Sequence, residues 1–194
     1  LLAYDTENRP DAYLYHLPYS QIINEFKIIP GVTNLHFRFG HVSIFQYISA
    51  FNYTLISGLN GLLFPPAIFC ISIFFYFLSN VLSIPKSKII NFGNLFSLLI
   101  FIFICMRANR FSEFGNDTMA HLSVFYLVFK FISLKNNDLN EYKSILLLSV
   151  FCFLNKSFLI FNFIMPLYLF FKGNLNIKEK IFNIANIFLV LWLF

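Results

Sequence analysis

The chain has 194 residues, of which 58% are hydrophobic, 21% aromatic and only 12% charged, and its mean hydropathy is +0.71. Soluble domains carry about 25% charged residues, so this composition excludes a water-soluble domain with a single apolar core. The formal net charge of +5 is spread over several short segments, which excludes a nucleic-acid-binding protein with a clustered basic patch.

The acidic residues are segregated from the apolar runs. All nine lie in short polar segments, and none occurs in residues 42–112, 118–137 or 142–178. A charge in hydrocarbon is costly, so this pattern predicts that the apolar runs lie in lipid and the acids in water. We therefore expect an all-α polytopic membrane protein whose helices form a bundle.

The polar segment 4–41 opens the chain. We predict two short amphipathic helices there, one with Pro10 in its first turn and an end near Pro18, and the other over residues 19–27. Residues 29–31, Ile-Pro-Gly, predict a turn. This arrangement is typical of a loop that lies on the membrane surface rather than in it.

The rest of the chain predicts one interfacial helix followed by membrane-spanning helices. Residues 42–57 are apolar but broken by Ser, Gln, Asn and Thr, which favours a helix in the membrane interface. The tripeptide 155–157, Asn-Lys-Ser, interrupts a long apolar run, so this run is either one tilted helix or two short helices that turn there. The spans that we expect are 59–82, 91–106, 118–134, 144–155, 157–171 and 181–194.

We expect residues 1–194 to be a single transmembrane domain fragment. No signal-peptide pattern precedes the polar segment, and the run that starts at Ile181 is shorter than the about 20 residues that a span needs. At least one helix before Leu1 and more after Phe194 would then be missing. Because the missing first helix should pack against the spans present, we predict that the fragment alone is inactive.

The charges of the loops predict the orientation. Loops 83–90, 135–143 and 172–180 carry lysines, and basic loops stay in the cytoplasm. The polar segment and loop 107–117 are then extracytoplasmic. The run 144–172 starts and ends on the cytoplasmic side, so it must cross the membrane twice. This favours two short helices with Lys156 at their outer turn.

The basic residues expected outside are mostly arginines, whereas those expected inside are all lysines. The guanidinium fork of arginine matches phosphate geometry, while lysine is a simple orienting charge. This asymmetry indicates an anionic ligand on the outer side. The candidate binders of a phosphate group in such a ligand are Arg38 and Arg107 or Arg110, with His16 as a further candidate.

Four segments carry a resemblance to a known family. DAYLYHLP at 11–18 and IPGVTNLHFRFG at 29–40 resemble the first extracytoplasmic loop of bacterial GT-C membrane glycosyltransferases, the superfamily of protein mannosyltransferases and aminoarabinose transferases. SEFGNDT at 112–118 resembles their second acidic loop, and NKS at 155–157 resembles a conserved Thr-Lys turn. The segments occur in the family's order, on the face that the loop charges place outside.

The resemblance implies an enzyme of the bacterial cytoplasmic membrane that moves a sugar from a polyprenyl-phosphate carrier to a lipid, glycan or protein acceptor. It implies that Asp11 is the base or orienter, that Asp117 holds substrate or metal, and that Lys156 holds the carrier phosphate. Tyr15 lies one helical turn after Asp11 and shares its face. The best-known members carry an adjacent acidic pair where Asp11 stands alone.

The expected partners are the lipid bilayer and the lipid-linked sugar donor. The resemblance also implies Mg²⁺ or Mn²⁺ as an optional cofactor, with Asp117 as a ligand. His121 lies one turn after Asp117 and is a less suitable ligand, because hard cations prefer oxygen. No cysteine spacing predicts a metal site or a disulfide framework.

Two other functions remain open at this point. A transporter or flippase for lipid-linked sugars would place ionisable groups or broken helices near the middle of the bilayer, and only the Pro65-Pro66 pair hints at that. A polysaccharide polymerase or ligase would share the substrate class but depend on a large late loop.

Overall fold

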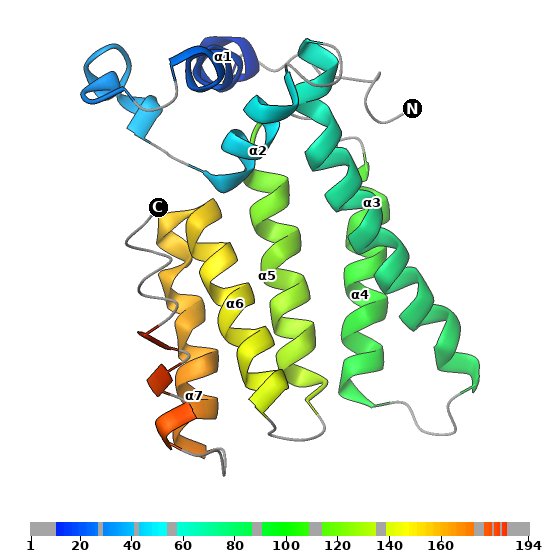
Figure 1. Ribbon diagram of the computed structural model, residues 1–194. Coiled ribbons are helices and arrows are strands. Elements are labelled where there is room, and N and C mark those ends of the chain that lie inside the picture. Colours follow the sequence, from blue (N-terminus) through cyan, green and yellow to red (C-terminus); the bar gives the residue numbers. More distant parts are fainter. Residues whose placement is uncertain are drawn as a thin grey trace. The chain divides into compact units, whose positions relative to one another are not determined.

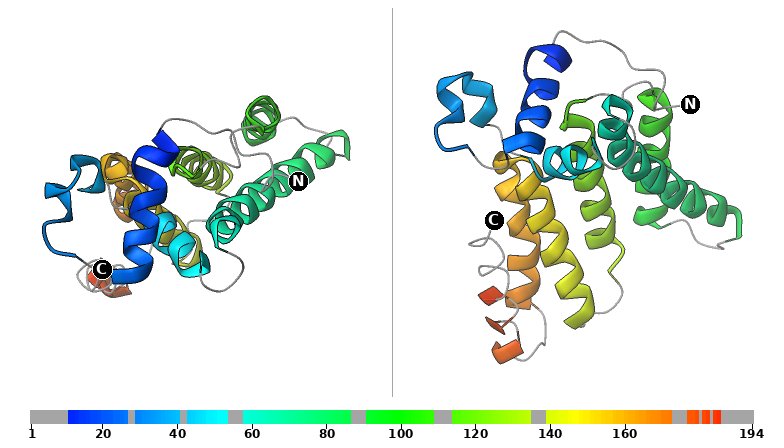
Figure 2. Two further views of the ribbon diagram at one scale, coloured as in Figure 1. Left: turned by 90° about the horizontal axis from the view of Figure 1, so that it is seen from above. Right: turned by 45° about the horizontal axis from the view of Figure 1, so that its top comes forward.

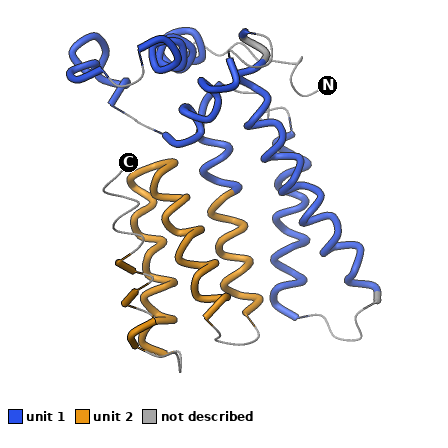
Figure 3. The backbone as a smooth tube through the Cα atoms, in the orientation of Figure 1, with its two compact units in different colours: residues 1–122 blue, residues 123–194 orange. Residues whose placement is uncertain are grey.

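The computed structural model describes residues 11–26, 29–40, 43–53, 58–86, 91–108, 114–134, 139–172, 177–179, 181–182 and 184–185. Within these ranges every regular element is a helix, so the all-α prediction is confirmed (Figure 1). The chain divides into two compact units, residues 1–122 and 123–194 (Figure 3). The division falls inside α5 (Asp117–Ile132).

The first unit begins with a continuous helical segment. The π-helical turn η1 (Ala12–His16) runs directly into α1 (Leu17–Phe26). The predicted break near Pro18 is therefore wrong. A π turn loosens the usual hydrogen-bond ladder, and here it directly precedes the proline, whose missing N–H would interrupt that ladder in any case. The predicted start at Pro10 lies outside the described residues.

Two short 3-10 turns, η2 (Val32–Asn34) and η3 (Phe37–Gly40), fold back on α1. The turn that precedes them needs Gly31, whose φ of 78° is unfavourable for other residues. Phe39 of η3 stacks on Tyr19 of α1 with ring centroids 5.4 Å apart. Together with Ile23 and Ala50 these rings form a small apolar core.

Three further helices precede the start of α5 in the first unit. α2 (Ile44–Asn52) packs against both α1 and α3 (Leu59–Ser83), and α3 in turn packs against α4 (Phe92–Met106) (Figure 2). A Cβ on Gly61 would collide with the backbone carbonyl of Asn52. This glycine therefore lets the backbones of α2 and α3 approach closely.

Hydropathy separates α3 from the other helices. Among the described residues, only the stretch Gly61–Ser83 is both long and apolar enough to cross a membrane, with a mean hydropathy of 2.1 in its most apolar window. The apolar helices Phe92–Met106 and Ser157–Lys172 are shorter. α3 continues through Pro65 and Pro66, which lie inside it. α3 begins after Gly58, and the short 3-10 turn η5 (Ile84–Lys86) follows its C-terminal end.

The second unit is an antiparallel helix pair beside the rest of α5. α6 (Leu139–Asn155) packs against the 3-10 segment η7 (Ser157–Phe163) and against α7 (Ile164–Lys172). Lys156 separates the two helical segments, and its backbone N–H donates to the carbonyl of Cys152 at 3.0 Å. The chain thus forms two helices here and not one long helix. The core of this unit consists of Leu127, Tyr142, Ile145, Leu146, Val150, Cys152 and Leu169. Most of the span expected at 181–194 lies outside the described residues.

Candidate functional site: a cationic aromatic cluster at η1 and η3

Arg38 and Tyr15 form the centre of a cluster on the first unit. The guanidinium carbon of Arg38 lies 4.6 Å from the centroid of the Tyr15 ring, a cation–π contact. Its Nη1 atom lies 3.6 Å from Oδ1 of Asp11, and both side chains are partly exposed. The sequence-predicted residues Asp11, Tyr15 and Arg38 are therefore brought together, although Arg38 comes from a different turn.

His36 accepts a hydrogen bond from the backbone of Arg38. The backbone N–H of Arg38 donates to Nδ1 of His36 at 3.2 Å. The His36 ring is nearly parallel to that of Tyr15, with centroids 6.1 Å apart, and it also stacks on Phe37. The loop histidine thus orients the arginine.

His16 extends the cluster toward α2. Its ring centroid lies 4.1 Å from that of Tyr15, and its Nδ1 atom lies 3.3 Å from Nε2 of Gln46. An amide nitrogen can only donate, so Nδ1 of His16 is the acceptor in this contact. A Cβ on Gly115 would come within 3.2 Å of the Nε2 atom of His16, which places the 114–116 segment directly against the histidine.

Asp117 contributes its charge to the same cluster. Burial raises the pKa of Tyr15 above its ordinary value; Arg38 opposes this shift, and the charges of Asp11 and Asp117 add to it. Asp117 is the first residue of α5, because the carbonyl of Asn116 already accepts from Ala120. A carboxylate in the first turn of a helix is stabilised by the helix dipole. Two acids from distant parts of the sequence therefore act on one tyrosine.

The remaining predicted residues lie elsewhere. Arg107 follows α4 and is exposed, and its backbone N–H closes that helix. Arg110 lies outside the described residues. Lys156 belongs to the second unit, where its Nζ atom lies 5.8 Å from the centroid of the Phe158 ring.

His121 is exposed on α5. Across the described ranges, no group of three or more His, Cys, Asp or Glu side chains is arranged to hold a metal ion. The divalent cation stays a prediction.

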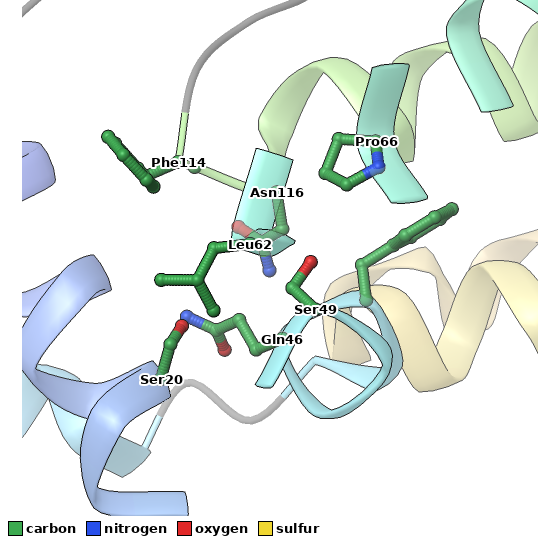
Figure 4. A pocket seen from close by; sticks show the side chains of 9 residues that line it. Ser20, Gln46, Ser49, Leu62, Pro66, Phe114 and Asn116 are labelled. Atoms are coloured by element: carbon green, nitrogen blue, oxygen red, sulfur yellow. The ribbon is translucent and has the colours of Figure 1, made fainter. Parts of the chain in front are cut away.

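A small cavity (Figure 4), partly open to solvent, lies beside the cluster. Its polar lining consists of Ser20 from α1, Gln46 and Ser49 from α2, and Asn116 from the segment before α5. Sequence reasoning did not identify these four residues. The available signal was the set of polar residues that breaks the apolar run 42–57.

These features define an all-α protein with an arginine–tyrosine–histidine cluster, two nearby carboxylates and an adjoining uncharged cavity. The chain belongs to the family described as "Domain of unknown function (DUF8201)", whose model matches residues 4–194. No curated protein and no solved structure matches the chain.

Proposed function

We propose that this protein is a membrane glycosyltransferase of the GT-C type. It moves a sugar from a polyprenyl-phosphate carrier to an acceptor at the outer face of the bacterial cytoplasmic membrane. The observation that carries the proposal is the meeting of Asp11, Tyr15, Arg38 and the charge of Asp117 in one cluster. These residues come from the two loops in which the sequence resembles that superfamily.

Residence in the membrane rests on the apolar helices. α3 is long and apolar enough to span a bilayer, and large apolar side chains such as Phe75, Leu99 and Ile102 are exposed on α3 and α4. Monomeric soluble proteins rarely expose apolar surface of this extent, whereas lipid covers it without cost. The proposed bundle is polytopic, with the polar segment 4–41 on the outer side.

Arg38 is the proposed phosphate binder. One ion pair with Asp11 does not use all the N–H donors of a guanidinium, and the Tyr15 ring fixes its plane. The remaining donors can bind two phosphate oxygens together, as arginine does at phosphate sites. Binding there neutralises the charge that develops on the leaving phosphate during sugar transfer.

The two acids then take different roles. In the transfer step an acceptor hydroxyl oxygen bonds to the anomeric carbon, the bond from that carbon to the phosphate oxygen breaks, and the hydroxyl proton passes to a base. Asp11 is engaged by Arg38, so its proposed role is to orient the guanidinium. Asp117, which is exposed at the start of α5, is the better placed of the two to receive the proton.

The test uses the full-length protein in liposomes with radiolabelled polyprenyl-phosphate sugars. We expect label to leave the carrier with wild type, and to stay on the carrier with Asp117→Asn and with Arg38→Ala. Asp11→Asn should slow transfer less than Asp117→Asn. Lys156→Ala tests the phosphate role that the resemblance implies, and EDTA followed by Mg²⁺ or Mn²⁺ tests the cofactor.

Two results would contradict the proposal. Full transfer by both Asp117→Asn and Arg38→Ala would remove its chemical basis. Movement of an unmodified lipid-linked sugar across the bilayer, with no glycosyl product, would identify a flippase instead. The sequence of α3 and α4 contains no Asp, Glu, Lys or Arg, which is a reason to rank transport second.

A further inference from the structure

The cavity beside the cluster has an uncharged polar lining. None of the nine described residues that line it is acidic or basic, and four of them carry a hydroxyl or an amide side chain. Phe45, Leu62 and Phe114 supply apolar walls. A charged ligand group would have no counter-charge here, so the lining selects against phosphates, carboxylates and ammonium groups.

The cavity lining includes the buried side chain of Gln46. Only 5% of its surface is exposed, and its Oε1 atom accepts no hydrogen bond from any residue that the structure describes. Its amide nitrogen is held by His16. A buried carbonyl oxygen without a donor is unfavourable, so an O–H or N–H group that reached it would be stabilising.

The space suits a single hydroxyl group. The narrow interior has room for about one water-sized group, so a sugar ring stays at the opening and only one substituent enters. In Figure 4 the side chains of Gln46, Ser49 and Asn116 lie around the cavity, with the terminal amide of Gln46 turned toward Ser20, and Phe114 lies farther out. An aromatic ring at the opening can pack against the C–H face of a pyranose.

The cavity is continuous with the Arg38 cluster through His16. This histidine contacts the Tyr15 ring on one side and the Gln46 amide on the other. The ring of Tyr15 in turn makes a cation–π contact with the guanidinium of Arg38. A series of contacts through Tyr15 and His16 therefore connects Arg38 with Gln46 of the cavity lining.

We infer that the cavity bounded by Gln46, Ser49 and Asn116 is a recognition site for one hydroxyl group of a neutral sugar, whose O–H donates to Gln46 Oε1. The inference rests on the proposed function, and it adds a determinant of which donor sugar is accepted. Its role is binding and not catalysis. The sugar contributes affinity through this site, while the carrier phosphate binds at Arg38.

The test compares two ligands on the full-length protein in nanodiscs. One is sugar-free polyprenyl phosphate, and the other is the same carrier bearing glucose, galactose, mannose or N-acetylglucosamine. We expect at least one sugar to bind about threefold to tenfold more tightly than the sugar-free carrier, which is what one hydrogen bond between neutral groups contributes. Gln46→Met keeps the side-chain length and should abolish this preference while leaving the affinity for the sugar-free carrier unchanged.

The controls separate this site from the fold and from the phosphate site. Gln21→Met replaces the other glutamine, which lies on α1 outside the cavity lining, and should keep the preference. Ser49→Ala removes a single hydroxyl and should reduce the preference, which keeps the test decisive if Gln46→Met does not fold. Arg38→Ala should lower the affinity for the sugar-free carrier and for the sugar-bearing carrier by the same factor.

Three outcomes would overturn the inference. These are an absence of preference for every sugar in wild type, a preference that persists in both Gln46→Met and Ser49→Ala, and a Gln46→Met variant that loses only thermal stability. If wild type binds no carrier at all, the proposed function fails. Saturation-transfer NMR with methyl β-D-glucopyranoside then decides the cavity separately: a signal that Gln46→Met removes supports the inference, and no signal overturns it.

Discussion

Arg38→Ala is expected to damage ligand binding far more than folding. The contacts that it removes within the protein are weak. A partly exposed ion pair such as that with Asp11 contributes about 0.2–1 kcal/mol, and an exposed cation–π contact such as that with Tyr15 about 0.5–1 kcal/mol. The free energy of unfolding should therefore fall by about 1 kcal/mol. For a chain of this size that corresponds to a decrease of about 2–4 °C in the unfolding temperature.

The expected loss of phosphate binding is larger. A hydrogen bond to a charged group contributes about 1.5–3 kcal/mol, and each 1.4 kcal/mol is about tenfold in affinity. The dissociation constant for sugar-free polyprenyl phosphate should thus rise about 10- to 100-fold in Arg38→Ala. Arg38→Lys keeps the charge but loses the fork, and it should fall between wild type and Arg38→Ala.

The assay is a titration of nanodisc-embedded protein with polyprenyl phosphate, in parallel with thermal unfolding of the same samples. Lys143→Ala is the control, because Lys143 is an exposed cation on α6 that the loop charges place on the cytoplasmic side. An unchanged affinity in Arg38→Ala, or an equal loss in Lys143→Ala, would refute the assignment of the phosphate to Arg38. A large loss of thermal stability in Arg38→Ala would instead show that the arginine has a mainly structural role.

Three other predictions test the geometry of the first unit. Gly115→Ala places a methyl group within 3.2 Å of His16 Nε2, so we expect reduced sugar transfer with a small change in unfolding temperature; unchanged transfer would show that this segment can move aside freely. Gly61→Ala forces α2 and α3 apart and should cost about 1–3 kcal/mol in thermal or denaturant unfolding, whereas wild-type stability would show that the close approach is not required. The pKa of Tyr15 is raised, chiefly by burial, so the stability that its phenol form provides is complete below the ordinary value of 10.0 and is lost as the pH rises through the folded-state pKa. Asp11→Asn removes one of the charges that raise this pKa and should lower it in ¹³C NMR of labelled tyrosine, and a rise would contradict the described contacts.

The sequence predicts the helices well because hydropathy and helix-capping are local properties. The apolar run near residues 91–106 appears as α4, which begins after Asn91, whose Oδ1 accepts from the backbone N–H of Asn94 at 2.8 Å. The continuous helix through Pro18 was not predictable from local rules. It depends on a π turn whose Tyr15 contacts Arg38 of η3 and whose His16 contacts Gln46 of α2.

The candidate site was only half accessible to sequence reasoning. Charged residues in polar loops identify themselves, so Asp11, Arg38 and Asp117 were found. Gln46 and Asn116 could not be found, because their relation depends on three chain segments that meet only in the folded unit. The phosphate role of Lys156 stays a prediction, since this residue belongs to the other unit.

The close approach of α2 and α3 at Gly61 has a consequence for how substrate preference could change over evolution. Because backbone meets backbone at this joint, side-chain repacking cannot adjust the spacing of the two helices there. The cavity walls that α2 and α3 supply are therefore close to fixed. The segment 114–116 is not part of any helix and supplies the remaining wall through Phe114. Exchange of Phe114 for a smaller or larger side chain is thus the simplest route by which a relative could accept a different sugar while keeping the same scaffold.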